Sequence, residues 1–124
     1  MKASSRRFAN AAVLHVAGRL DQDTCDAFGA ELSALVASTA RDGAAVVIDL
    51  SAIEYISSAG LRCLMLASRQ AKAQHGRILV AQLQPMVAEI FEISHFNLVF
   101  QVFPTVREAL AAASTEAAVA FDAA

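Results

Sequence analysis

The run of seven residues at positions 44–50, Ala-Ala-Val-Val-Ile-Asp-Leu, constrains the fold more than any other stretch of this chain. It is apolar except for Asp49, contains several β-branched residues, and is bounded by Gly43 and Ser51, which favour turns. A short apolar run of this kind is typical of a strand that is covered on both faces, as in a parallel or mixed sheet. The rest of the chain must therefore supply the helices that cover it.

Strand-like runs and helical spacings alternate along the remaining sequence. Further strands are expected at 6–10, with a hairpin turn near 10–11, and at 13–17, 77–81 and 98–103. Helices are expected to begin at 21–24, near 57, at 84–85 and at 104–105; the first would end at Gly43 and the second at 74–76. This alternation predicts an α/β fold.

The length of 124 residues fits one domain, and the sequence contains neither an internal repeat nor a linker. Residues 114–124 are alanine-rich and would either extend the last helix or fray. No apolar run reaches the roughly 18 residues of a membrane span, and no long apolar run follows the basic N-terminus, so we expect neither a membrane helix nor a secretory signal. The net charge of −2, without a basic stripe, argues against nucleic acid as the main partner.

The cysteines and histidines do not form a recognisable metal or redox motif. Cys25 and Cys63 are far apart in the sequence, so we expect two reduced, small apolar side chains. His15, His75 and His95 lack the spacing of metal ligands and are interpreted as surface or packing residues. The sequence therefore predicts neither a metal site nor a cofactor.

The turn Ser57-Ser-Ala-Gly60 lies where a predicted strand ends and a predicted helix begins. A serine at such a place can simply cap the helix, because its hydroxyl accepts a hydrogen bond from a free amide of the first turn. Gly60 lets the backbone pass close to the sheet. The same amides and the helix dipole also favour an anion, so a phosphoserine would be accommodated there. A serine hydrolase would need a glycine where Ile56 stands, which argues against Ser58 as a catalytic nucleophile.

Residues 47–64, Val-Ile-Asp-Leu-Ser-Ala-Ile-Glu-Tyr-Ile-Ser-Ser-Ala-Gly-Leu-Arg-Cys-Leu, closely resemble the signature of the STAS domain of bacterial anti-sigma factor antagonists. Residues 18–21 are similar to the family's turn before its first helix, 87–96 to a later helix and the entry to the last strand, and 106–110 to the closing helix. The resemblance covers about residues 6–113. It implies a mixed, mostly parallel β-sheet of four to five strands, with about four helices packed mainly on one face.

In that family the serine that accepts a phosphate lies two residues before the motif glycine, and this position corresponds to Ser58. The residue before it is often aspartate; here it is Ser57, which becomes an alternative acceptor. The residue after it is often serine or threonine, whereas Ala59 carries no competing hydroxyl. Asp21 matches an aspartate that supports partner recognition or phosphorylation, and its alternative role is to cap a helix. The predicted partner-binding segment also includes Gly60, Leu61 and Arg62.

The resemblance implies partner switching in the bacterial cytoplasm. The unphosphorylated protein would bind an anti-sigma factor, often a serine kinase of the histidine-kinase-like ATPase fold, and phosphorylation of Ser58 would release it. A metal-dependent serine phosphatase would remove the phosphate. On this interpretation the chain is a monomer or weak dimer that binds partners without being an enzyme, and it neither binds nucleic acid nor enters a membrane. One alternative is a STAS accessory subunit of a lipid-transport ATPase complex, a class that commonly lacks the acceptor serine. The other is an enzyme that uses Ser58 as a nucleophile.

Overall fold

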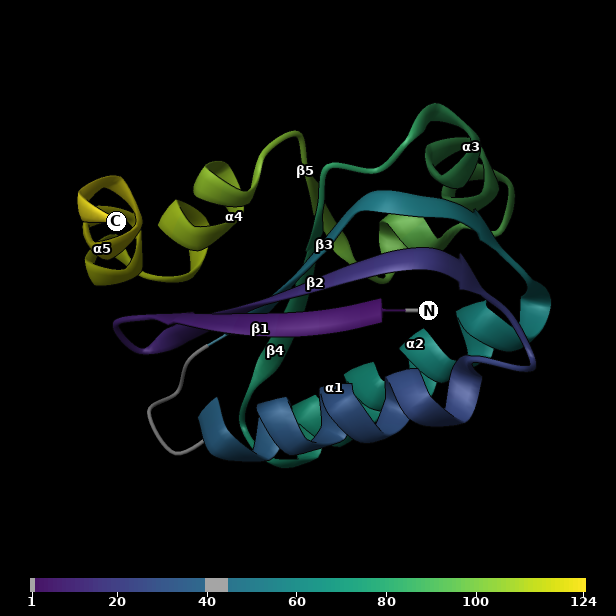
Figure 1. The fold of residues 1–124 in the computed structure, drawn as a ribbon, viewed down its shortest axis with the longest axis horizontal. Coiled ribbons are helices and arrows are strands. Elements are labelled where there is room, and N and C mark those ends of the chain that lie inside the picture. Colours follow the sequence, from purple (N-terminus) through teal and green to yellow (C-terminus); the bar gives the residue numbers. More distant parts are fainter. Residues whose placement is uncertain (1, 40–44) are drawn as a thin grey trace.

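The central strand of the molecule is the one predicted from the apolar run, and strands and helices alternate around it (Figure 1). The computed structural model describes residues 2–39 and 45–124. Its strands are β1 (Lys2–Phe8), β2 (Ala11–Leu20), β3 (Ala45–Ile56), β4 (Arg77–Ala81) and β5 (Gln101–Phe103). Its helices are α1 (Cys25–Thr39), α2 (Ser58–Ala73), α3 (Pro85–Ile93), α4 (Val106–Ala113) and α5 (Thr115–Ala123), and a short 3-10 helix, η2 (Phe96–Leu98), precedes β5.

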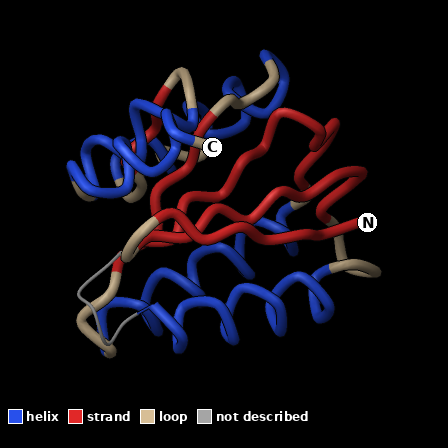
Figure 2. Tube along the Cα trace, turned by 60° about the vertical axis from the view of Figure 1, so that its left-hand side comes forward, coloured by secondary structure: helices blue, strands red, loops and turns tan. Residues whose placement is uncertain are grey.

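The strands form one sheet in the order β1-β2-β3-β4-β5. β1 and β2 make an antiparallel hairpin, and all other neighbours pair in parallel. Parallel neighbours need crossover connections, which α1 supplies between β2 and β3 and α2 supplies between β3 and β4. The two helices lie side by side under the same face of the sheet (Figures 1 and 2). The N-termini of both helices therefore meet the carboxyl ends of β2 and β3 at one edge of the sheet.

Both faces of the sheet are covered, which explains the continuous apolar run in β3. Side chains alternate between the faces along a strand. On the first face, Ile48 packs in one cluster with Phe28 of α1, Leu64 of α2 and Phe91 of α3. Burying each of these large side chains contributes roughly 1.5–3 kcal/mol. This larger core holds α1 and α2 against the strands whose ends carry the predicted site.

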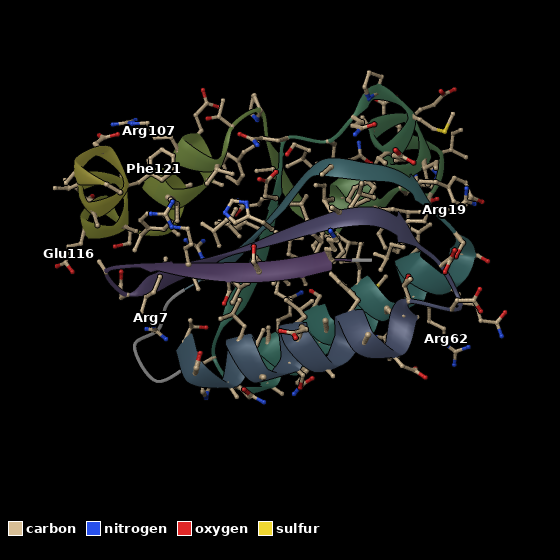
Figure 3. All side chains as sticks on the ribbon, viewed as in Figure 1. Arg7, Arg19, Arg62, Arg107, Glu116 and Phe121 are labelled. Carbon is tan, nitrogen blue, oxygen red and sulfur yellow. A yellow bond between two sulfur atoms is a disulfide. The ribbon has the colours of Figure 1, made fainter. Side chains whose placement is uncertain are left out.

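The second face is covered by α4 and α5. Val47 of β3 packs there with Leu110 of α4 and Ala117 of α5. The guanidinium of Arg107 donates two hydrogen bonds to the carboxylate of Asp122, at 2.8 and 2.9 Å, and so joins the two helices. Figure 3 shows Arg107 at the surface of α4. α4 and α5 lie at the end of the molecule opposite the start of α2 (Figure 1).

The structure confirms the α/β class, the mixed and mostly parallel sheet, and the N-terminal hairpin. Residues 114–124 differ from both expectations, because they form a separate helix that neither extends α4 nor frays. Ser114 has extended backbone angles, φ −165° and ψ 128°, and its hydroxyl caps α5 by accepting from the amide of Ala117 at 3.3 Å. The ring of Phe121 then packs on Phe8 of β1, with 5.3 Å between the centroids.

The predicted strand at 98–103 is shorter than expected. Its first residues belong to η2 and the turn that follows, and only Gln101–Phe103 pair with β4. The reason is a cluster of three rings, in which Phe96 and Phe100 both pack against Phe91 of α3. Closing this cluster requires a tight turn where a strand would hold the two rings apart. The helix end that we predicted at Gly43 lies outside the described residues.

No helix in the described ranges is both long enough and apolar enough to cross a lipid bilayer.

Candidate functional site

The two serines at the start of α2 have different environments. Ser57 is the N-cap residue, with φ −84° and ψ 173°, and its hydroxyl oxygen accepts a hydrogen bond from the amide of Gly60 at 3.2 Å. Ser58 is the first residue of the helix and is exposed. Its hydroxyl has no hydrogen-bond partner among residues 2–39 and 45–124. The capping role that we considered for the serine pair therefore belongs to Ser57, and Ser58 presents a free hydroxyl to solvent.

A close contact between β2 and α2 holds this turn in place. The amide of Ser57 donates to the carbonyl of Leu20 at 2.9 Å. A Cβ atom on Gly60 would lie 2.4 Å from the same carbonyl oxygen, closer than real Cβ atoms approach. Only glycine fits there without a shift of the backbone. β2 reaches this contact through an irregular register near Gly18, whose φ of 108° is favourable only for glycine.

Asp21 follows Leu20 directly, so this contact brings it beside the start of α2. One carboxylate oxygen of Asp21 accepts from the amides of Asp23 at 3.0 Å and Thr24 at 3.3 Å. The other oxygen lies 3.7 Å from Nε of Arg19. The Arg19 guanidinium in turn covers the ring of Tyr55, 4.9 Å from its centroid. These amides belong to the turn at residues 21–24, before α1 begins at Cys25, so Asp21 stabilises the turn that leads into the helix and does not cap the helix itself. Its carboxylate is held in a fixed, partly exposed position.

The remaining residues of the predicted partner-binding segment differ in how far they are exposed to solvent. Gly60 is buried, and Leu61 is partly buried against the first core, so both shape the site from beneath. Ala59 is also partly buried. Arg62 is exposed and lies four residues after Ser58, and therefore on the same side of the helix; Figure 3 shows it pointing away from the body of the molecule. Leu66, another four residues on, is 53% exposed although it is apolar. Ser58, Arg62 and Leu66 therefore form an exposed row along the first half of α2.

The prediction that both cysteines are free thiols is wrong. Cys25 and Cys63 form a disulfide that joins α1 to α2, with 6.2 Å between their Cα atoms. Their separation of 38 positions in the sequence concealed the pair, because we judged proximity from sequence spacing alone. A signal was nevertheless present. Each cysteine lies within two turns of the start of a helix, and both helices were predicted to follow strands of a mostly parallel sheet.

A second polar cluster lies on the face of the sheet that carries α4. Nδ1 of His15 donates to the carboxylate of Asp49 at 2.8 Å, and the other carboxylate oxygen accepts from the Ser51 amide and from Gln82, both at 3.0 Å. Burial alone would raise the pKa of Asp49, but the hydrogen bonds from Ser51, His15 and Gln82 together hold it below its usual value. Gln82 also accepts from the amide of Val106 and so fixes the start of α4.

His15 is thus a partly exposed side chain that is held by Asp49, a partner that the sequence prediction of a surface or packing residue did not include. A cavity of about 630 Å³ opens beside the pair. Within the described part of the chain, no group of three or more side chains is placed to hold a metal ion.

The comparison with known families agrees with this geometry. The family model described as "Mlab, STAS domain" matches residues 4–102. The chain belongs to the STAS domain family. Among curated proteins, the putative anti-sigma factor antagonist BtrV of Bordetella bronchiseptica is 41% identical over 96 residues, which are 77% of this chain and 79% of that protein.

Solved structures show the same STAS fold. An anti-sigma factor antagonist from Mycobacterium paratuberculosis is 26% identical, with a TM-score of 0.79 over 90% of this chain and 92% of that one. A putative anti-sigma factor antagonist from Thermotoga maritima is only 12% identical, yet has a TM-score of 0.80 over 90% and 93% of the two chains. The segment that matches the STAS model includes every residue of the site described above and ends before α4 and α5.

Proposed function

We propose that this STAS domain is an anti-sigma factor antagonist whose binding to an anti-sigma factor is switched off by phosphorylation of Ser58. The observation that carries the proposal is the free, exposed hydroxyl of Ser58 beside a serine that is already used as a helix cap. The 41% identity to BtrV supports an anti-sigma factor as the partner. The expected partner is a serine kinase of the histidine-kinase-like ATPase fold, and a metal-dependent phosphatase would restore the binding form in the cytoplasm.

The physical basis of the switch is a change of charge at a contact surface. A phosphate on Ser58 adds a charge of about −1.5 to −2 at neutral pH. Its own helix tolerates this charge, because the positive end of the helix dipole stabilises an anion at the first residue by roughly 0.3–1 kcal/mol. A partner that covers Ser58 without supplying a cation must desolvate the phosphate, at a cost of several kcal/mol. Binding would then weaken by about a hundredfold or more, with no refolding of the domain.

The docking surface that this proposal assigns to the partner is the exposed row Ser58, Arg62 and Leu66 on α2, next to Asp21. The exposed apolar side chain of Leu66 would supply buried area, and Arg62 and Asp21 would supply polar contacts at its edge. Arg62 can also reach a phosphate on Ser58, since the two residues are four apart on one helix. Phosphorylation would thereby add a negative charge to this surface and also draw the guanidinium of Arg62 into an ion pair with the phosphate.

The test begins with isolation of the kinase from the source bacterium on immobilised protein, followed by its purification. The purified kinase and ATP are incubated with wild-type protein and with the Ser58→Ala and Ser57→Ala variants, and the phosphate is located by mass spectrometry. We expect phosphate on Ser58 in wild type and in Ser57→Ala, and none in Ser58→Ala. Phosphate on Ser57, or unchanged phosphorylation of Ser58→Ala, would contradict the assignment. Recovery of a transport ATPase subunit, with serine unmodified, would favour the alternative of a lipid-transport accessory subunit.

The chain contains a matched control for the effect of charge on binding. Thr115 is the exposed first residue of α5, and its cap Ser114 bonds the amide three residues later as Ser57 does in α2. Thr115→Asp therefore adds a charge at the same helical position at the opposite end of the molecule. We expect Ser58→Asp to weaken kinase binding at least tenfold in calorimetry and Thr115→Asp to leave it unchanged. Equal losses in both variants would indicate a general effect of charge and would refute a local switch.

A further inference from the structure

The disulfide joins the two elements that carry the proposed partner site. Cys25 is the first residue of α1, four residues after Asp21, and Cys63 lies five residues after Ser58 in α2. We propose that the Cys25–Cys63 pair is a reversible redox site that controls how rigidly residues 21–24, here called the Asp21 turn, are held against the start of α2. The inference deepens the function proposed above, and only its last step, the effect on phosphorylation, rests on that function.

The position of the bond makes it accessible to reagents. Both cysteines are only partly buried, and a cavity of about 220 Å³ opens beside them, lined also by Leu66 and Gln70. Exposed disulfides are the labile ones, whereas structural disulfides are protected from reductants. The proposed function also places the protein in the cytosol, where the disulfides that do occur are mostly transient and redox-sensing. Accessibility and compartment both favour a bond that opens and closes.

The reduced pair would also find hydrogen-bond acceptors nearby once the two sulfurs have moved apart to a non-bonded distance. The Cys25 sulfur lies 3.6 Å from the carbonyl oxygen of Ala59, and the Cys63 sulfur lies 3.6 Å from the carbonyl oxygen of Cys25. A disulfide sulfur has no proton to donate, but each thiol of the reduced pair would find an acceptor already in place. The packing of Phe28 and Leu64 in the first core holds α1 and α2 together in either state. Reduction should therefore loosen the helix starts while leaving the fold intact.

The chemistry balances with a hydroperoxide as oxidant and a dithiol as reductant. One thiolate attacks the peroxide oxygen, which breaks the O–O bond, forms a sulfenic acid and releases an alkoxide or hydroxide that takes up a proton. The second thiol attacks the sulfenic sulfur, forms the S–S bond and releases water. The two sulfurs lose two electrons and the hydroperoxide gains two. In the reverse direction a dithiol attacks the bond, passes through a mixed disulfide, and leaves both cysteines as thiols while it is itself oxidised.

The redox state would change how mobile the Asp21 turn is relative to the start of α2. In the oxidised protein the bond fastens the first turn of α1 to α2 close to Ala59, so the Asp21 turn and Ser58 keep one relative position. In the reduced protein this turn can move more freely, and a partner that contacts both segments must fix it on binding. Pre-organisation lowers that cost and strengthens binding. We therefore expect the oxidised protein to be the better kinase substrate.

The first experiment measures the redox equilibrium of the purified chain. The protein is equilibrated in mixtures of reduced and oxidised glutathione, quenched in acid and alkylated with a maleimide. The chain contains two cysteines, so the number of labels found by mass spectrometry reports this pair alone. We expect the protein to pass from mostly oxidised to mostly reduced across the glutathione ratios of the cytosol. A pair that stays oxidised at the reducing end, or stays reduced with excess hydroperoxide, would overturn the proposal.

The second experiment measures hydrogen exchange in the oxidised and reduced proteins, with the double variant Cys25→Ser, Cys63→Ser as control. We expect amides at 21–25 and 57–61 to exchange at least fivefold faster after reduction, and amides of β4 to be unaffected. The exchange rates of the double variant should equal those of the reduced protein and should not change when an oxidant is added. An equal change in all amides would indicate a purely structural disulfide and would overturn the coupling to the site.

The last step uses the kinase isolated above with pre-oxidised protein and with the double variant. We expect phosphate transfer to Ser58 to be at least threefold faster for the oxidised protein at subsaturating concentration. Equal rates would refute the regulatory step. Absence of phosphate from Ser58 in both proteins would instead refute the proposed function, and the first two experiments would still decide whether the redox site exists.

Discussion

Replacement of Gly60 by alanine tests the contact that positions the whole site. The added Cβ would lie 2.4 Å from the carbonyl oxygen of Leu20 and 3.0 Å from its carbonyl carbon. These are backbone atoms of β2, which cannot rotate away as the end of a flexible side chain could. β2 and α2 must therefore move apart by several tenths of an ångström.

The size of the effect follows from three contributions. Overpacking of a tight site costs roughly 1–3 kcal/mol. The same carbonyl accepts the amide of Ser57 at 2.9 Å, and weakening that bond costs about 1 kcal/mol. Alanine is a better helix former than glycine by about 1 kcal/mol, which offsets part of the loss. We expect Gly60→Ala to lower the free energy of unfolding by about 2 kcal/mol.

Gly29 offers a matched control within α1. A Cβ atom on Gly29 would meet nothing within 4 Å. Gly29→Ala should therefore benefit from the higher helix propensity of alanine without any steric clash, and should stabilise the protein by up to about 1 kcal/mol. Urea denaturation followed by circular dichroism measures both changes. If Gly60→Ala proved as stable as wild type, the contact with Leu20 would not be the constraint that we describe, and the fixed placement of Asp21 beside α2 would lose its basis.

Three further predictions concern the site and its surroundings. Ser57→Ala should cost about 0.5–2 kcal/mol of unfolding free energy through loss of the cap, whereas Ser58→Ala should stay within about 0.5 kcal/mol of wild type in the same urea titration. Because the folded-state pKa of Asp49 is depressed, its contribution to stability should be present above about pH 4 and be lost as the pH falls through the lower folded value; Asp49→Asn should remove this dependence in unfolding curves measured from pH 6 to 2. Reduction of the Cys25–Cys63 bond should lower the free energy of unfolding by at most about 4 kcal/mol, the chain-entropy value for a loop of 38 residues, and a dithiol added to the urea titration measures it.

Much of the architecture could be predicted from local pattern. The apolar run at 44–50 identified the central strand because burial on both faces leaves no polar alternation, and the described part of this run lies in β3. The position of Ser57 and Ser58 at a helix start was equally predictable, because capping depends on residue types only three positions apart. Both features are determined by residues that are close together in the sequence, so the sequence alone is enough to predict them.

The features that were missed depend on neighbours in space. The hydrogen bond of His15 to Asp49 needs the parallel register of β2 and β3, which places these two residues opposite each other. The disulfide needs the side-by-side packing of α1 and α2, and the short β5 needs the ring cluster around Phe91. In each case the local pattern permitted several conformations, and a contact between distant segments selected one of them.

The distinction between neighbours in sequence and neighbours in space also determines whether a capping serine indicates a functional site. Three helices in the described chain begin with a hydroxyl that accepts from the amide three residues later, namely α2, α4 and α5. A cap alone therefore does not mark a functional site. The first helical residue is a buried valine in α4 and an exposed Thr115 in α5, so only α5 repeats the free hydroxyl of Ser58. What Thr115 lacks is the setting of α2: the neighbouring Asp21 turn, the exposed Arg62 on the same face and the covalent link to α1. The comparison of Ser58→Asp with Thr115→Asp thus isolates this setting from the cap, and it is the setting that carries the proposed function.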